Sequence, residues 1–164
     1  MMGGGRLDDA VSSYRRALDI NPKYFEAHYN PGNVLKTSGR FEGAISSYYR
    51  ALEINPASID SHLNLGNVLR ELGRLDDAVA CYRRALGIKP EFAMAWGNLG
   101  AALNELGQTD EAVSSCLRAL KIKPDYADAH YNLANTLKNL GRFDEAMTSY
   151  YQAIKITRIS PTRI

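Results

Sequence analysis

The strongest constraint on this chain is a pattern that repeats every 34 residues. Gly5, Gly39, Gly73, Gly107 and Gly141 are each separated from the next by that distance, and the residues between them resemble one another. A fixed period of this length is typical of stacked supersecondary units, each of which buries its apolar face on its neighbours. We therefore expect an elongated stack of units without one central core.

Each unit contains two amphipathic segments. In residues 73–106, one series of apolar residues with helical spacing begins at Leu75 and a second begins at Ala95. Pro90 separates the two series, because proline cannot continue a helix. Gly107 supplies the left-handed backbone conformation that commonly ends a helix. The pattern predicts a hairpin of two helices in every unit, and therefore an all-α fold.

The same residues resemble the tetratricopeptide repeat (TPR) family, whose period is also 34 residues. The resemblance rests on Trp96, Leu99 and Gly100, followed at the family's spacing by Ala112 and Pro124. It implies a right-handed α-solenoid of antiparallel helical hairpins, a TPR superhelix in which inner and outer helices alternate. The implied units of this single domain, residues 1–164, are a leading outer-helix half-repeat (5–24), four complete repeats (25–58, 59–92, 93–126 and 127–160) and a tail (161–164).

The composition indicates which classes of partner, and which cellular compartment, suit this chain. The 164 residues carry 20 basic and 18 acidic side chains, and a net charge of +2 is too small to favour a nucleic acid or an anionic membrane. The N-terminal residues lack the apolar segment of a secretory signal. Cys81 and Cys116 stand alone in different repeats, which favours a reducing compartment. We expect a cytoplasmic protein with no nucleic-acid or membrane partner.

The first inner helix departs most from the pattern. Pro31 occupies the position that Leu65, Leu99 and Leu133 hold in the other repeats. A proline inside a helix removes one hydrogen bond and costs about 3 kcal/mol or more. The sequence therefore predicts a kink or a break just before Pro31.

No group of residues suggests catalysis or a bound metal. His28, His62 and His130 occupy the position that Trp96 fills in the third complete repeat. Equivalent helices lie about 8–10 Å apart, whereas zinc ligands each lie about 2 Å from the ion. We interpret the histidines as packing residues. No serine or cysteine is placed by the local sequence beside a base, so we expect no enzyme activity, no metal and no cofactor.

Basic residues also recur on the outer helices. Acidic residues nearly balance them in number, so we interpret them as a solvated surface and not as a nucleic-acid site. They are Arg15, Arg16, Arg50, Arg83, Arg84 and Arg118.

The inner helices carry an asparagine ladder, a set of seven asparagines at two equivalent positions. The first position holds Asn30, Asn64, Asn98 and Asn132, and the second, three residues later, holds Asn33, Asn67 and Asn135. An amide offers both hydrogen-bond donors and an acceptor, so it can pair with the backbone of an extended peptide. Helix steps of about 10 Å match about three extended residues, so four repeats would hold roughly ten residues.

Other side chains complete the predicted groove. Its candidate apolar anchors are Tyr29, Leu63 and Tyr131, its basic rim is Lys36, Arg70 and Lys138, and its acidic rim is Glu26, Asp60 and Asp128. This arrangement predicts that a peptide is oriented by its charge. The alternative is that the asparagines bridge neighbouring inner helices or hold water.

The repeated asparagine resembles the TPR region of the O-linked N-acetylglucosamine transferases, in which an asparagine ladder holds substrate polypeptides. The resemblance implies a protein-interaction scaffold whose partner is a protein or an extended peptide. Two alternatives stay open. The chain is a substrate-receptor segment of a larger enzyme such as a peptide O-glycosyltransferase, or it is a structural protein that self-associates through uncapped ends.

Overall fold

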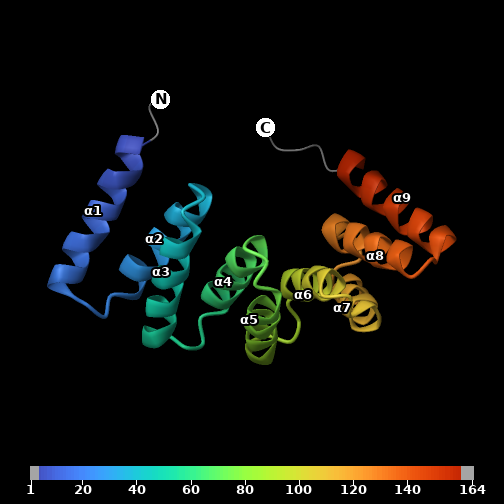
Figure 1. Cartoon of the computed structure of the whole chain (residues 1–164), viewed down its shortest axis with the longest axis horizontal. Helices are drawn as coiled ribbons and strands as arrows, with labels where there is room; N and C mark the ends of the chain where they lie inside the picture. The colour runs from blue at the N-terminus through green and yellow to red at the C-terminus, as the bar shows by residue number, and fades with distance from the viewer. Residues whose placement is uncertain (1–3, 160–164) are drawn as a thin grey trace.

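The computed structural model describes residues 4–159, and every regular element in that range is a helix. The helices follow one another along an open arc, with α1 and α9 at its two ends (Figure 1). No helix in these residues is long and apolar enough to cross a membrane. The elements are α1 (Gly4–Ile20), α2 (Phe25–Thr37), α3 (Phe41–Ile54), α4 (Ile59–Glu71), α5 (Leu75–Ile88), α6 (Ala93–Glu105), α7 (Thr109–Ile122), α8 (Ala127–Asn139) and α9 (Phe143–Ile159).

The helices pair as hairpins that stack in chain order. The inner helices α2, α4, α6 and α8 each have 13 residues, and the outer helices α3, α5 and α7 each have 14. Every helix packs on the next one along the chain, and each inner helix also contacts the next inner helix. Within the described range, α1 packs only on α2 and α9 packs only on α8. The predicted all-α solenoid of antiparallel hairpins is confirmed.

Glycine ends each inner helix in the predicted way. Gly39, Gly73, Gly107 and Gly141 have φ values of 73°, 73°, 78° and 74°, in the left-handed region that other residues rarely adopt. This conformation reverses the chain between the inner and outer helix of each hairpin. The 34-residue spacing of these glycines therefore sets the period of the stack.

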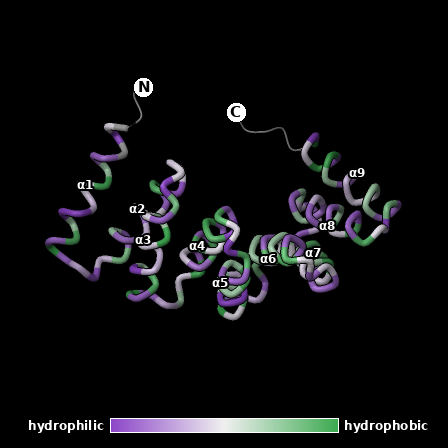
Figure 2. The backbone as a smooth tube through the Cα atoms, in the orientation of Figure 1, coloured by the Kyte–Doolittle hydropathy of each residue, from purple (hydrophilic) through white to green (hydrophobic). Residues whose placement is uncertain are grey.

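The apolar core runs along the stack in a band between inner and outer helices. Green and purple segments alternate along each helix in Figure 2, as expected for amphipathic helices that bury one face. Tyr48 and Tyr82 are completely buried between the two layers, together with Leu65, Leu69 and Leu103. The core is therefore built by neighbouring hairpins, which explains why no single hairpin would bury its own apolar face.

The helix α2 is not broken at Pro31. It spans Phe25–Thr37, the same length as the other inner helices, with Pro31 buried inside it. The predicted break is therefore wrong, and the kink stays a prediction. Packing of α2 against α1, α3 and α4 stabilises the helix across a position where the proline cannot donate to the carbonyl of Ala27.

Candidate functional site

Two adjoining hollows lie along the inner helices. The first has a volume of about 450 Å³ and is lined by residues that include Lys36, Asn67, Arg70 and Asn98. The second has a volume of about 280 Å³, and its lining includes Arg70, Asn104, Tyr131, Asn132 and Lys138. Because Arg70 borders both hollows, they form neighbouring parts of one groove. Most of the predicted peptide-binding residues in α4, α6 and α8 are therefore brought together.

Asparagines at the first position of the ladder bridge neighbouring inner helices. Three of the four donate from their amide nitrogen to an acceptor on the preceding inner helix. Asn64 also donates to the hydroxyl of Tyr29 at 3.0 Å. The bridging bonds are Asn64 to Oδ1 of Asn33 (3.3 Å), Asn98 to Oδ1 of Asn67 (2.9 Å) and Asn132 to the carbonyl oxygen of Gly97 (3.2 Å).

Asparagines at the second position bind the outer helix of their own hairpin. In each case the amide oxygen accepts a hydrogen bond from a tyrosine hydroxyl. The pairs are Tyr48 with Asn33 (2.8 Å), Tyr82 with Asn67 (2.8 Å) and Tyr150 with Asn135 (2.5 Å). The predicted site did not include these tyrosines, although they bind three of the seven asparagines of the ladder.

The third complete repeat lacks both members of this pair. Ala101 occupies the asparagine position and Cys116 occupies the tyrosine position. Without an amide oxygen at residue 101, Asn132 has no side-chain acceptor there, and it bonds the backbone of Gly97 instead. The joint replacement of two residues 15 positions apart is the signal in the sequence that could have revealed the pairing.

Among the described residues, the hydrogen bonds leave some amide oxygens and some amide nitrogens of the ladder without a partner. Within residues 4–159, Oδ1 of Asn98 and of Asn132 accepts no hydrogen bond, and the side chain of Asn30 makes none. At the second position, Nδ2 of Asn67 donates none, and the same holds for Asn33 and Asn135. All seven asparagines are half-buried. Some amide atoms therefore bridge neighbouring inner helices, as the alternative interpretation of the ladder predicted. Others have no partner in this part of the chain and are available to a ligand.

The predicted anchors differ in accessibility. Tyr131 has 54% of its surface exposed and lines the second hollow. Tyr29 is half-buried and stacks on Phe25 with ring centroids 5.6 Å apart. Leu63 is only 6% exposed and belongs to the core, so its prediction as a ligand anchor is corrected. The Leu63 side chain is part of the buried cluster that joins neighbouring repeats.

Two residues of the basic rim already have hydrogen-bond partners within the protein. The ammonium group of Lys36 donates to Oδ1 of Asn64 at 2.7 Å, and burial lowers the pKa of Lys36. Arg70 donates to Glu105 at 2.7 Å, a partner that the sequence analysis missed. Lys138 is exposed. The acidic rim residues Glu26, Asp60 and Asp128 are exposed as well.

The histidines and Trp96 hold the loops that precede the inner helices. Trp96 Nε1 donates to the carbonyl oxygen of Pro90 at 2.8 Å, and an indole N–H is only a donor. The equivalent bonds join Nε2 of His28 to Pro22 (3.0 Å), of His62 to Pro56 (2.8 Å) and of His130 to Pro124 (3.0 Å). By this equivalence Nε2 carries the proton in each histidine, and the interpretation of these residues as packing residues is supported. No cluster of three or more potential metal ligands lies in the described part of the chain.

The two cysteines are poor nucleophiles because the fold buries them. Burial raises the pKa of the Cys81 thiol to about 11 and that of Cys116 to about 12. A nucleophilic cysteine needs a lowered pKa and an accessible thiolate. Their environment is therefore that of core residues.

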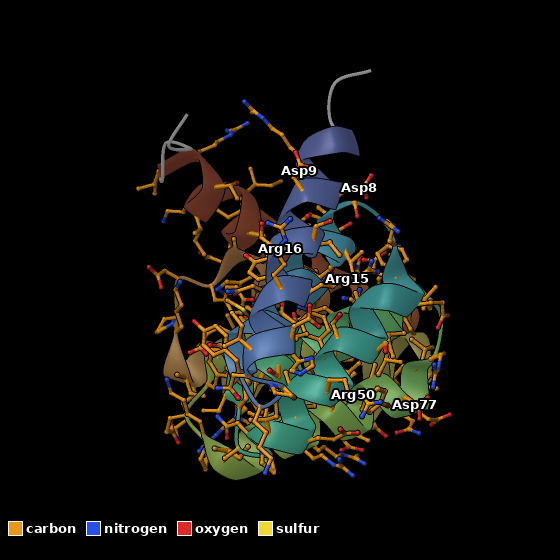
Figure 3. All side chains as sticks on the ribbon, turned by 90° about the vertical axis from the view of Figure 1, so that its left-hand side faces the viewer. Asp8, Asp9, Arg15, Arg16, Arg50 and Asp77 are labelled. Atoms are coloured by element: carbon orange, nitrogen blue, oxygen red, sulfur yellow. The ribbon has the colours of Figure 1, made fainter. Side chains whose placement is uncertain are left out.

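Charged residues on the outer helices are paired or interspersed. In Figure 3, Asp8 and Asp9 lie on the same helix as Arg15 and Arg16. Three other arginines of this surface contact carboxylates: Arg50 with Glu53 (3.0 Å), Arg83 with Glu111 (2.6 Å) and Arg118 with Glu91 (2.7 Å). Over residues 4–159, the basic side chains thus form no uninterrupted stripe.

The fold is similar to that of several solved repeat proteins. A crystal structure of MamA is 22% identical, with a TM-score of 0.86 over 94% of this chain and 90% of that one. MamA from Desulfovibrio magneticus RS-1 is 17% identical, with a TM-score of 0.87 over 96% and 89%. YrrB, described as a TPR protein with an unusual peptide-binding site, is 26% identical, with a TM-score of 0.79 over 97% and 80%. A comparison with curated protein sequences finds no match.

Sequence profiles give the family directly. Profiles described as tetratricopeptide repeat match residues 63–127 and 127–156, and one described as TPR repeat matches residues 3–39 and 32–69. These segments follow one another along almost the whole chain, as the resemblance of Trp96, Leu99 and Gly100 to the repeat consensus implied. The chain belongs to the tetratricopeptide repeat family.

Proposed function

We propose that this chain is a protein-interaction scaffold that binds an extended segment of a partner protein along α2, α4, α6 and α8. The observation that carries the proposal is that several amides of the asparagine ladder use one polar atom within the stack and leave the other unused. Asn98 leaves its acceptor oxygen unused, and Asn67, to which it is bonded, leaves its donor nitrogen unused. An extended backbone presents N–H and C=O groups in alternation, so it is the ligand that matches them.

One such site lies between α4 and α6. A peptide N–H would donate to Oδ1 of Asn98, and a neighbouring C=O would accept from Nδ2 of Asn67. Both side chains line the first hollow, which provides room for the peptide backbone. Contacts of this kind are independent of the peptide's side chains, so they position the ligand without selecting its sequence.

Affinity requires an apolar anchor beside these polar contacts. A single hydrogen bond contributes only about 0.5–1.5 kcal/mol net. Tyr131 offers an exposed ring next to Asn132 in the second hollow, where an apolar ligand side chain would cover it. Lys138 on the same helix would attract an acidic ligand residue. We therefore expect the selected peptides to contain an apolar and an acidic residue near each other.

YrrB supports this proposal as a structural precedent. It shares the fold, and its structure is described as having an unusual peptide-binding site. The proposal for this chain rests on its own Asn67, Asn98 and Tyr131.

Selection from random peptides displayed on phage, each of roughly ten residues to match the groove, tests the proposal. Selected peptides are then titrated by fluorescence anisotropy against the wild type, Tyr131→Ala and Lys138→Ala. We expect each variant to weaken binding by about tenfold, as for loss of one good contact. Tyr49→Ala, at a 45% exposed position on the outer helix α3, is the matched control and should bind normally. Failure to select peptides, or equal binding by all variants, would refute the proposal.

A further inference from the structure

The helix α9 exposes apolar positions that are buried or half-buried on the preceding outer helices. Ile45 on α3 and Val79 on α5 are each 6% exposed, because the following inner helix covers them. The equivalent residue on α9, Met147, is 71% exposed. Leu86 on α5 is 7% exposed, whereas its equivalent Ile154 is 52% exposed.

Four exposed apolar residues of α9 form one stripe. Phe143, Met147, Tyr151 and Ile154 are 64%, 71%, 65% and 52% exposed. Their spacing of four, four and three residues places them along one side of a helix. At 1.5 Å per residue the stripe is about 16 Å long. A contiguous exposed apolar surface of this kind is typical of an interaction site.

Opposite charges flank the two ends of this stripe. Asp144 lies in the first turn of α9 and Lys155 near its last turn, and both are exposed. Eleven residues make about three helical turns, so the two side chains lie on the same flank. Neither forms an ion pair with any described residue, whereas the neighbouring Glu145 is held by Arg142 at 2.6 Å.

We propose that this stripe binds a second copy of the chain, with the two α9 helices antiparallel about a two-fold axis. A single register then places Phe143 beside Ile154 of the second copy and Met147 beside Tyr151 of the second copy. In the same register Asp144 lies beside Lys155 of the second copy, and the axis passes at the level of Ser149 along the helix. The apolar and the ionic pairings agree on this register, which a parallel arrangement would not allow because it brings like charges together.

The area of the stripe limits the affinity of the proposed dimer. A standard interface buries about 800 Å² on each partner. Four side chains that are somewhat more than half exposed supply roughly 500 Å², if a large side chain presents about 150–250 Å². We therefore expect a reversible dimer whose dissociation constant is micromolar or weaker. An isologous contact closes at two copies, so larger assemblies are not expected.

Analytical ultracentrifugation of the whole chain over a wide concentration range tests the dimer. The double variant Met147→Glu with Ile154→Glu changes only exposed positions, and we expect it to raise the dissociation constant by at least about a hundredfold. Leu117→Glu, at a 51% exposed position on α7, is the control and should dimerise normally. Circular dichroism establishes that each variant keeps its helices.

Charge exchange tests the antiparallel register. Asp144→Lys alone and Lys155→Asp alone place like charges together, and we expect each to weaken the homodimer by about tenfold. An equimolar mixture of these two variants, and the chain that carries both changes, should regain wild-type association. The proposal would be overturned if the wild type stayed monomeric, or if the charge changes did not alter its association. It would also be overturned by assemblies larger than a dimer, which contact between α9 and α1 would produce.

Discussion

The hydroxyl of Tyr82 donates a hydrogen bond to Oδ1 of Asn67 at 2.8 Å, and the same oxygen accepts a second bond from Asn98 at 2.9 Å. Oδ1 of Asn67 thus links three helices: the outer helix α5, its inner partner α4 and the next inner helix α6. Because the oxygen is occupied, Asn67 can offer a ligand only its amide nitrogen. The asparagine ladder therefore holds the stack together with some atoms and faces the groove with others.

Removal of the Tyr82 hydroxyl should destabilise the protein without disturbing its core. We expect Tyr82→Phe to lower the free energy of unfolding by about 1 kcal/mol, because the ring stays buried while one hydrogen bond is lost. Tyr49→Phe is the control, since the Tyr49 side chain is 45% exposed. Urea unfolding followed by circular dichroism measures both. Equal stability of Tyr82→Phe and the wild type would show that the bond contributes nothing.

Two helical glycines should respond to alanine with opposite signs. A Cβ atom at Gly66 would lie 2.7 Å from the buried ring of Tyr82, so we expect Gly66→Ala to cost about 1–3 kcal/mol. A Cβ atom at Gly87 would meet no side chain and no backbone outside its own helical turns within 4 Å, so Gly87→Ala should stabilise the helix by about 0.5–1 kcal/mol. Thermal unfolding of the two variants gives the comparison. A loss of stability at Gly87, or none at Gly66, would contradict the packing described.

The two thiols make stability fall at alkaline pH. Burial raises the pKa of Cys81 from 9.0 to about 11 and that of Cys116 from 9.0 to about 12. Above pH 9 the unfolded chain loses these protons while the folded chain keeps them, so the free energy of unfolding decreases as pH rises. Below pH 9 this contribution is fully present.

Urea unfolding at about pH 8 and about pH 10 measures this slope. Replacing both cysteines with alanine should reduce it, while Tyr48 and Tyr82, whose pKa values burial also raises, maintain part of it. The same slope in the wild type and the double variant would contradict the assignment to the thiols.

Pro31 should be the residue whose replacement stabilises the protein most. We expect Pro31→Leu to raise the free energy of unfolding by up to about 3 kcal/mol, because it restores the backbone donor inside α2 and fits an apolar position. Pro31→Ala restores the donor without the larger side chain and separates the two effects. Differential scanning calorimetry records the change as a rise of several degrees. No rise in either variant would mean that α2 already compensates for the missing bond.

The sequence was sufficient to predict the fold because its local signals agree. Gly39, Gly73, Gly107 and Gly141 end helices in the predicted left-handed conformation. The break at Pro31 was predicted wrongly because a local rule ignored the packing of α2 on three neighbouring helices. Tertiary contacts outweighed the preference of one residue.

The site was predictable only in part, because the roles of its atoms depend on distances between helices. The inner-helix positions of Asn67 and Asn98 followed from periodicity. Periodicity could not show that Asn98 reaches Asn67, that Glu105 pairs with Arg70 or that Leu63 is buried.

We propose that a peptide lies along the inner helices and bonds to the unused amide atoms of the ladder. Titration of isotope-labelled protein with a selected peptide, followed by the backbone and side-chain amide signals in NMR spectra, tests it most directly. We expect the largest shifts at the Nδ2 protons of Asn67 and Asn135 and at the backbone amides around Asn98 and Tyr131. Shifts confined to the outer helices α3, α5, α7 and α9, with the asparagine side chains unchanged, would contradict it.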